Sequence, residues 1–507
     1  MKRKICLLLA MLLLLSAVLG LSSCKKDGEG DGGEETTVST TGNGGGDGVE
    51  NSKLYERLPT GDYDGYTFTM LVAQSDYAIT TMVPTETSES LNQAIFRRNS
   101  TVKERLNINI VEESRPVPAY NTVLSEVRKL NSTNDFAYDV VFNEVAYQTP
   151  LAQEGAYFAV DEYEAYIDLN NPWWFSDAMD SLKIGGRTCE LFGDLHLMYY
   201  DSIYAFAFNQ KMFMDSHIEF PYELVREGKW TMSEFKEILN TVYAAAEDNH
   251  YGVAGVNNFS WAMLTSMGFS LIEQDDAEGL VPYNDDETFV LIYEELLDLY
   301  RSNGDGQDNW LMAAKESAAY ESGAFTEEMA NGGTNGGAYG AFIDGRAAFL
   351  GTTIGGLRRV RNASFDYGIV PMPKYNTDQR KYVNYIYSGA ASCGIPISSP
   401  DLERTCVILE NLSAYSHMYV KNEYYEIVVQ LRTVRDNDSL EMLDVVFGHS
   451  DNSTTKFELD QVYALGFSGV VRINLSDAVA EIKHSMDSIK TSTVASNIKK
   501  VIDAYKE

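Results

Sequence analysis

The stretch that decides the fold is F-I-D-G-R-A-A-F-L-G-T-T-I-G-G-L-R-R-V-R-N-A-S-F-D-Y-G-I-V-P-M-P-K-Y, residues 342–375. Asp344-Gly345 is a turn signal, because glycine reaches positive φ without steric cost. Residues 346–350 predict a short buried strand, and residues 351–356 predict a loop that brings backbone N–H groups and threonine hydroxyls close to a ligand. A second strand, residues 365–372, runs into two prolines that make a stiff exit. This order suits a segment that leaves one lobe of the molecule for another.

Length and charge narrow the class of protein. The chain has 507 residues, whereas a single core stops growing at about 250–300 residues. The formal net charge is −34, which repels nucleic acid and anionic membrane surfaces, so we expect neither as a partner. An acidic surface also keeps a secreted protein soluble. The 44% of hydrophobic residues is enough for ordinary globular packing.

The N-terminus resembles a bacterial lipoprotein signal. Lys2-Arg3-Lys4 precede an apolar run at residues 5–21, and the run ends in Leu21-Ser22-Ser23-Cys24, which resembles a lipobox. We therefore predict a signal peptide at residues 1–23, lipidation (palmitate) at Cys24 and a flexible Gly/Glu/Thr-rich tether at residues 24–53. The alternative is a membrane-spanning anchor, because the run approaches the ~20 residues that cross a bilayer.

Three cysteines lie beyond the lipobox: Cys189, Cys393 and Cys406. An odd count argues against a complete disulfide framework, and the chain has no C-x-x-C and no histidine at ligand spacing. We expect buried thiols, and no metal site or cofactor.

The first third of the chain alternates strand and helix patterns. Strands are predicted at residues 66–73, 107–113 and 138–142, and helices at residues 88–106 and 120–130. Such alternation predicts βαβ units and a mostly parallel sheet, in which ligands bind outside the carboxyl ends of the strands.

The loops at those strand ends hold the first candidate ligand residues. Asp76 and Tyr77 follow the first strand, and Asn143, Glu144 and Tyr147 follow the third. For Asp76, Asn143 and Glu144 the alternative is capping of a helix N-terminus, a role that Asp and Asn perform well.

Aromatic residues supply the second group of candidates. Trp173-Trp174 could offer a flat face to a sugar ring, and we assign Trp174 to the ligand, with core packing as the alternative. Asn258 and Trp261 follow a strand predicted at residues 251–256, so the same topological rule places them at the cleft. For Trp261 the alternative is packing within its own lobe.

Other local patterns predict elements around the chain crossings. Residues 189–192 and 197–204 are expected to form a hairpin that leads into the first crossover, and Ser399 is expected to cap a helix at residues 400–414. An amphipathic helix is predicted at residues 285–300. Tyr200, Thr352, Thr353 and Tyr387 complete the predicted ligand set.

The stretch at residues 342–375 resembles the C-terminal-lobe segment and hinge of bacterial extracellular solute-binding proteins (family 1) of carbohydrate-type ABC importers. The family's order of a phenylalanine, then Gly-Lys/Arg-Ala-Ala-Met, then Tyr-Gly-x-x-Pro-x-Pro recurs here as Phe342, Gly345-Arg-Ala-Ala-Phe349 and Tyr367-Gly-Ile-Val-Pro-Met-Pro373. Phe349 stands where the family often has Met.

The resemblance implies an α/β, two-lobed, periplasmic-binding-protein-like fold, each lobe a mostly parallel sheet flanked by helices, joined by a multi-strand hinge. It places residues 54–200 and 376–432 in lobe 1 and residues 201–375 and 433–507 in lobe 2. The implied function is that of a monomeric lipoprotein, anchored to the cell membrane and facing the extracellular or periplasmic side. It would capture a sugar or oligosaccharide in the interlobe cleft and deliver it to an ABC permease.

Two alternatives remain open. One is a binding protein for peptides or other polar solutes, although 32 tyrosines and the paired tryptophans favour sugars. The other is a surface carbohydrate-active enzyme, which needs two carboxylates across the scissile bond, and no motif marks such a pair. We therefore predict no enzymatic activity. Arg358, Arg359 and Arg361 could bind an acidic sugar or a phosphate, or could form an exposed basic turn.

Overall fold

The computed structural model describes residues 54–460, except for positions 76–77, 86, 246–249, 256–257, 271, 276–278, 283–285, 302–310, 314–336, 431–436 and 449–454, and a few single positions beyond residue 460. Contacts divide the chain into two compact units, Met1–Glu56 and Arg57–Glu507, and the strands and helices from β1 onward belong to the second unit. The predicted signal peptide, the lipidation site Cys24, the tether and the candidates Asp76 and Tyr77 lie outside the described residues.

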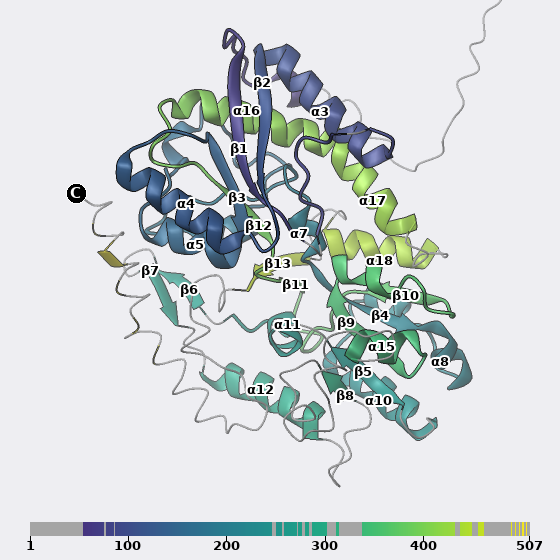
Figure 1. Ribbon diagram of the computed structural model, residues 1–507. Coiled ribbons are helices and arrows are strands. Elements are labelled where there is room, and N and C mark those ends of the chain that lie inside the picture. Colours follow the sequence, from purple (N-terminus) through teal and green to yellow (C-terminus); the bar gives the residue numbers. More distant parts are fainter. Residues whose placement is uncertain are drawn as a thin grey trace, which may run out of the picture. The chain divides into compact units, whose positions relative to one another are not determined.

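The strands and helices alternate through most of the described chain (Figure 1). The strands are β1 Tyr66–Ala73, β2 Ile108–Arg115, β3 Val140–Glu144, β4 Tyr204–Asn209, β5 Tyr251–Gly255, β6 Ile272–Asp275, β7 Gly279–Pro282, β8 Leu311–Ala313, β9 Ala347–Thr353, β10 Tyr367–Val370, β11 Tyr382–Ile386, β12 Ala391–Gly394 and β13 Thr455–Leu459. The α-helices are α3 Ser90–Leu106, α4 Tyr120–Thr133, α5 Val145–Gln153, α6 Ser176–Asp180, α7 Met198–Asp201, α8 Gln210–Asp215, α9 Tyr222–Arg226, α10 Met232–Ala245, α11 Phe259–Ser266, α12 Asp286–Arg301, α15 Gly337–Ile343, α16 Leu402–Tyr415, α17 Lys421–Gln430 and α18 Asn437–Phe447. Short helical turns are η1 Asp161–Tyr163, η2 Gly355–Val360 and η3 Ser416–Val420, the last with π-helical geometry.

The first sheet has the strand order β12-β3-β1-β2. β1 pairs in parallel with β2 and β3, and β12 pairs antiparallel with β3. Leu71, Ala73 and Val141 share a core with α4 and α5, and by strand alternation their neighbours point to the opposite face. Figure 1 shows α4 and α5 on one side of this sheet and α3 and α16 on the other. The three predicted strands and the two predicted helices are confirmed to within a few residues at their ends.

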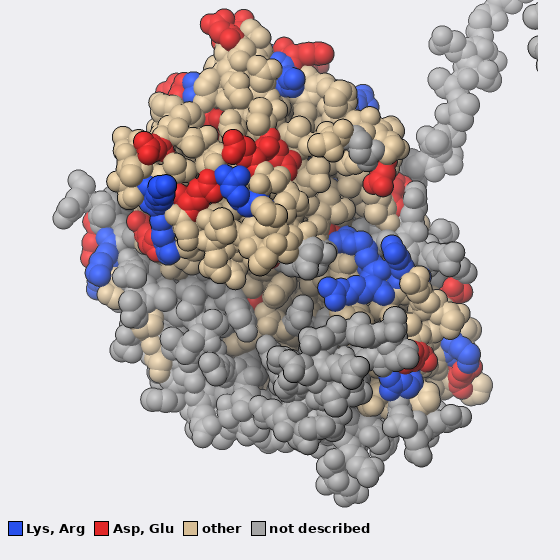
Figure 2. Space-filling view, viewed as in Figure 1, with Lys and Arg blue, Asp and Glu red and all other residues tan. Residues whose placement is uncertain are grey.

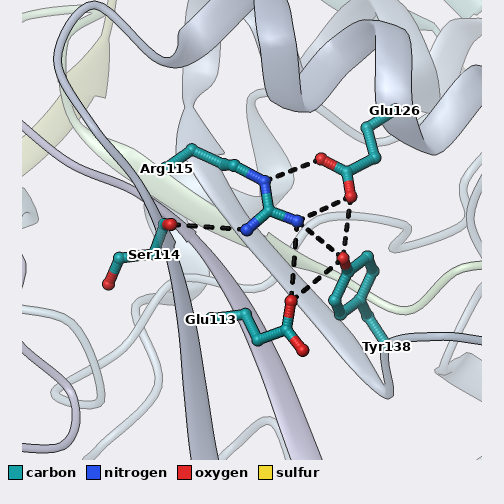
Figure 3. A network of polar contacts seen from close by, with 5 residues as sticks. All are labelled: Glu113, Ser114, Arg115, Glu126 and Tyr138. Atoms are coloured by element: carbon teal, nitrogen blue, oxygen red, sulfur yellow. Dashed lines mark hydrogen bonds and ion pairs between the residues drawn. The ribbon is translucent and has the colours of Figure 1, made fainter.

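An ion pair holds α4 against the edge of the first sheet (Figure 3). Arg115, the last residue of β2, donates from Nε and Nη2 to the two carboxylate oxygens of Glu126 at 2.9 and 2.7 Å. The Tyr138 hydroxyl donates to the same carboxylate at 2.7 Å. The bond from Arg115 lowers the pKa of Glu126, so the pair stays charged at neutral pH. This network fixes the carboxyl end of β2.

The second sheet is mixed and has the order β10-β4-β9-β5-β8. β9 and β5, and β5 and β8, are parallel, whereas β10 with β4 and β4 with β9 are antiparallel. Its core is aromatic: the Phe349 ring lies 5.3 Å from Phe206, 5.1 Å from Phe235 and 6.0 Å from Trp230, measured between ring centroids. The position that holds Met in the resembled family is therefore the centre of an aromatic cluster here.

The predicted glycine and threonine loop at residues 351–356 is wrong in its first half. β9 continues through Thr353, and Gly351 pairs with Gly255 of β5. A Cβ at either glycine would come within 2.3 Å of the Phe259 ring. The two glycines are therefore needed where an aromatic ring lies flat on the sheet, not where a backbone meets a ligand. Gly345 has φ of +75°, which confirms the predicted turn.

The predicted hairpin at residues 189–192 and 197–204 is also wrong. Leu191 exchanges two backbone hydrogen bonds with Cys393 of β12, at 2.8 and 2.9 Å, and residues 198–201 form the short helix α7. A fully buried apolar run looks the same in a helix and in a strand, so its pattern does not separate the two. Ser399 does not cap the following helix, because the helix begins at Leu402 and the Asp401 side chain accepts from the Arg404 N–H at 3.0 Å.

The three predicted thiols are confirmed as free and buried: Cys189, Cys393 and Cys406. Burial raises the pKa of the Cys406 thiol to about 12, so it is inert at neutral pH. Within the described part of the chain, no group of three or more His, Cys, Asp and Glu side chains could hold a metal ion. None of the described helices combines the length and the apolar character needed to cross a bilayer.

Candidate functional site

The candidate site is the junction where the chain passes between the two sheets. The chain leaves the part that contains the first sheet at α7 and enters β4 at Tyr204. It later passes back from β11 to β12 across residues 387–390. The two crossing segments are bonded to each other: Ile203 and Ile386 form a β-bridge, and the Tyr387 N–H donates to the Ser202 carbonyl at 3.0 Å. We call residues 200–205 and 385–391 the junction segments.

The second sheet presents its predicted ligand residues beside the first junction segment. Thr353 pairs with Tyr204 and Thr352 with Ala205. The Thr352 hydroxyl lies 2.8 Å from the Tyr339 hydroxyl and is fully buried. The Thr353 hydroxyl accepts from the Gly356 N–H at 3.2 Å. Both hydroxyls thus have partners within the chain, and Thr353 is the more accessible of the two.

Asn258 sits at the carboxyl end of β5, as the topological rule predicts. Its backbone is left-handed, with φ of 54°, and its amide nitrogen donates to an Asp460 carboxylate oxygen at 3.0 Å. Tyr385 lies beside them, with its hydroxyl 3.5 Å from the same amide nitrogen. Trp261 is one turn further along α11, a helix that packs against β11, and the residue is 7% exposed.

The carboxyl end of β3 reaches the second junction segment. Glu144 pairs with Ala391, and the next residue's N–H donates to the Ala390 carbonyl at 2.8 Å. The Asn143 amide donates to the Tyr120 carbonyl at 3.1 Å and accepts from the Glu144 N–H at 3.0 Å. Glu144 occupies the N-cap position of α5 but makes no side-chain capping bond, so the capping alternative is wrong for that residue. Tyr147 stacks on Tyr120 with centroids 5.4 Å apart.

Trp174 and Tyr200 are predicted ligand residues whose side-chain polar atoms both donate hydrogen bonds within the chain. The Trp174 indole N–H donates to Glu410 at 2.7 Å and the residue is 5% exposed. The Tyr200 hydroxyl donates to Asp194, and its ring stacks on Tyr424 at 5.6 Å. Trp174 is therefore packed in the core, which is the alternative that the sequence left open for the paired tryptophans.

The residue that sequence reasoning missed is Asp201. Its side chain is fully buried, and it accepts from Arg358 Nη1 at 2.6 Å and from the Tyr424 hydroxyl at 2.6 Å on one oxygen, and from the Ile79 N–H at 2.8 Å on the other. Burial alone would lower the pKa of Arg358, but the Asp201 carboxylate holds it above its ordinary value. A signal was present in the sequence: a single acidic residue stands between two tyrosines and a buried apolar strand.

Arg358 is therefore not part of an exposed basic turn. Its neighbours differ: Arg359 is exposed and lies 5.4 Å from the Tyr339 ring centroid, and Arg361 is exposed. Figure 2 shows basic side chains gathered over the part of the molecule where Figure 1 labels β9, β10 and α18. Binding of an anion by these arginines stays a prediction.

A second buried acid, Asp194, lies on the first-sheet side of the junction. Burial alone would raise its pKa, but Lys421 and bonds from His417 and Tyr200 hold the pKa below its ordinary value. Asp194 therefore stays ionised, with the His417 imidazole and the Tyr200 hydroxyl as its direct partners. His417 lies in the π-helical turn η3, a geometry that often marks functional positions.

The fold of this chain was compared with those of known proteins. No protein-family model matches the sequence, and no curated protein sequence matches it either. In three dimensions the chain is similar to the sugar-binding protein MalE from the phytopathogen Xanthomonas citri, with a TM-score of 0.56 and 12% identity, over 87% of this chain and 99% of that one. The chain has the fold of a substrate-binding protein.

A second structure supports the same fold. The cyclic α-maltosyl-1,6-maltose binding protein from Arthrobacter globiformis matches with a TM-score of 0.51 and 10% identity, over 87% of this chain and 98% of that one. The predicted two-lobed α/β class is confirmed, and we call the parts that contain the first and second sheets the first and second lobes. The lobe boundaries predicted at residues 200, 375 and 432 stay predictions.

Proposed function

We propose that the chain is an extracellular solute-binding lipoprotein of the carbohydrate-type ABC importers, which captures a sugar or oligosaccharide between its lobes and delivers it to a membrane permease. The observation that carries the proposal is the convergence of predicted ligand residues on the junction segments. Asn258 and Thr353 approach from the second lobe and Glu144 from the first, and Tyr387 lies on a junction segment itself, whereas the Tyr147 ring stacks on Tyr120 of α4. The fold shared with two sugar-binding proteins supports it.

The same residues favour binding over catalysis. Four of the described carboxylates lie at the junction, Glu144, Asp194, Asp201 and Asp460, and the last three each accept a hydrogen bond from the chain. A glycosidase needs one carboxyl free to donate a proton and a second free to attack or to activate water. The proposed cycle is therefore one of capture, lobe closure and release, with no covalent step.

A thermal-shift screen of the full chain tests the proposal. The panel contains mono- and oligosaccharides, amino acids and short peptides. A ligand at a hundred times its Kd stabilises the native state by about 2.7 kcal/mol. One carbohydrate of the panel should therefore raise Tm, and it should be recovered chemically unchanged after the measurement. A rise with peptides alone, or conversion of the sugar to a product, would refute it.

A pair of tyrosine variants links the screen to the junction. Tyr387→Ala removes a half-buried ring on a junction segment, and Tyr375→Ala removes another half-buried ring, in the loop after β10. We expect Tyr387→Ala to raise the sugar Kd at least tenfold and Tyr375→Ala to leave it unchanged. Equal affinities for the two variants would move the ligand away from the junction.

A further inference from the structure

The Asp201 carboxylate joins segments from both lobes. The Ile79 N–H belongs to the loop that follows β1, and Tyr424 belongs to α17, which packs against α3 in the first lobe. Arg358 belongs to η2, which packs against β9 and α15 in the second lobe. Asp201 itself belongs to the junction segment that enters β4. One buried side chain therefore contacts the first lobe, the second lobe and the segment between them.

The local packing is built for this close approach. A Cβ on Gly355 would lie 3.0 Å from the Asp201 carbonyl oxygen and 3.1 Å from its Cβ, so glycine lets η2 reach the end of α7. The Ile354 N–H donates to the Ile203 carbonyl at 2.8 Å beside it. On the other side, the Tyr424 ring stacks on Tyr200. The segments that carry Arg358 and Tyr424 are thus both packed against the first junction segment as well.

Breaking one contact affects the others. A rotation that takes η2 away from α7 removes Arg358 and leaves the buried carboxylate with two neutral donors, the Tyr424 hydroxyl and the Ile79 N–H. A buried charge that loses its opposite charge is strongly disfavoured. The buried charge of Asp201 therefore opposes this rotation unless water or another cation replaces the guanidinium. The same carboxylate also accepts a hydrogen bond from Ile79 in the loop after β1.

We propose that Asp201 is a positioning residue that sets the angle between the two lobes, by holding Arg358 of the second lobe against Tyr424 and Ile79 of the first. Its effect on ligand affinity rests on the proposed function, whereas its effect on the lobe angle does not. Because the residue also bonds to Ile79, it ties the loop after β1 to the same angle. Loss of the Arg358 contact releases both.

Distances between two spin labels test the proposal without any ligand. The full chain carries labels at Lys103→Cys on α3 and Met214→Cys on α8, both exposed positions, in a background with Cys6→Ser and Cys24→Ser. The remaining three thiols are buried. Pulsed electron–electron double resonance then reports the distribution of distances between the two labels, and so between the lobes.

The matched variants are Arg358→Met and Arg359→Met, two arginines in the same turn of which the first pairs with Asp201 and the second lies over the Tyr339 ring. We expect Arg358→Met to broaden the distribution or to shift its mean by several ångströms, Arg359→Met to match the wild type, and Arg358→Lys to restore the narrow distribution.

Identical distributions for the two methionine variants would overturn the proposal. Failure of Arg358→Lys to restore the narrow distribution would also overturn it, since it would show that the charge is not what holds the angle. With a sugar from the thermal-shift screen, Arg358→Met should change the Kd at least tenfold and Arg359→Met should not. If no sugar binds, the proposed function fails, and the label distances still decide the role of Asp201.

Discussion

Glu190 should make the stability of this protein fall as the pH rises from about 4.5 to 7. Burial raises the pKa of its carboxyl to about 7 from an ordinary value of 4.5, and the hydrogen bond from the Ser392 hydroxyl offsets only part of the rise. The unfolded chain therefore loses this proton at lower pH than the folded chain. Between the two values the folded state binds more protons, so raising the pH favours unfolding, and the loss levels off above pH 7. The difference corresponds to about 3 kcal/mol when the carboxyl is fully ionised.

The substitution Glu190→Gln isolates this effect. Glutamine keeps the shape and an acceptor for the Ser392 hydroxyl, which donates to Glu190 at 2.7 Å, but it has no charge to bury. We expect the stability of the variant, relative to wild type, to increase by about 3 kcal/mol between pH 4.5 and pH 8. For a chain of this length that is a Tm difference of roughly 3 °C.

The assay is thermal unfolding followed at intervals of pH for wild type, Glu190→Gln and a control. The exposed Glu104 supplies the control, since Glu104→Gln removes a carboxylate that is already in water. Its Tm profile should run parallel to that of the wild type. If the Glu190→Gln profile is parallel as well, the carboxyl does not titrate differently in the folded state and the reasoning about its burial is refuted.

Two further substitutions have clear outcomes. Gly351→Ala places a methyl group 2.3 Å from the Phe259 ring, so it should cost about 1–3 kcal/mol and lower Tm, and the loss should shrink in a Phe259→Ala background; equal losses in both backgrounds would contradict the steric explanation. Cys24→Ser removes the proposed lipid site, so the protein should move from the membrane fraction to the soluble fraction on cell fractionation, whereas continued sedimentation with membranes would favour the spanning-anchor alternative.

Local sequence patterns are sufficient for most of the elements. β1 lies at Tyr66–Ala73, as its β-branched and aromatic residues predict, and α12 lies within a residue of its predicted bounds at Asp286–Arg301. Two of the errors involve contacts with distant segments. Leu191 of the predicted hairpin bonds to Cys393 of β12, and Gly351 lies against the Phe259 ring.

The candidate site is predictable in part. The rule that ligands bind at the carboxyl ends of parallel strands selects Asn143 and Asn258 from the strand pattern alone, and both residues lie beside the junction segments. The roles of the polar groups are not predictable in the same way, because each depends on a partner. The Asn258 amide, for example, bonds to Asp460, which lies 202 residues away.

The sequence by itself determined the alternating strands and helices of residues 66–142, the buried thiols and the resemblance to two-lobed binding proteins, because hydrophobic periodicity and turn residues act over a few neighbours. Only the tertiary structure decided that Asp201 would be the residue shared by both lobes. Its partners lie 122, 157 and 223 residues away along the chain. No local pattern records which donors a buried carboxylate will meet once the chain has crossed between its sheets.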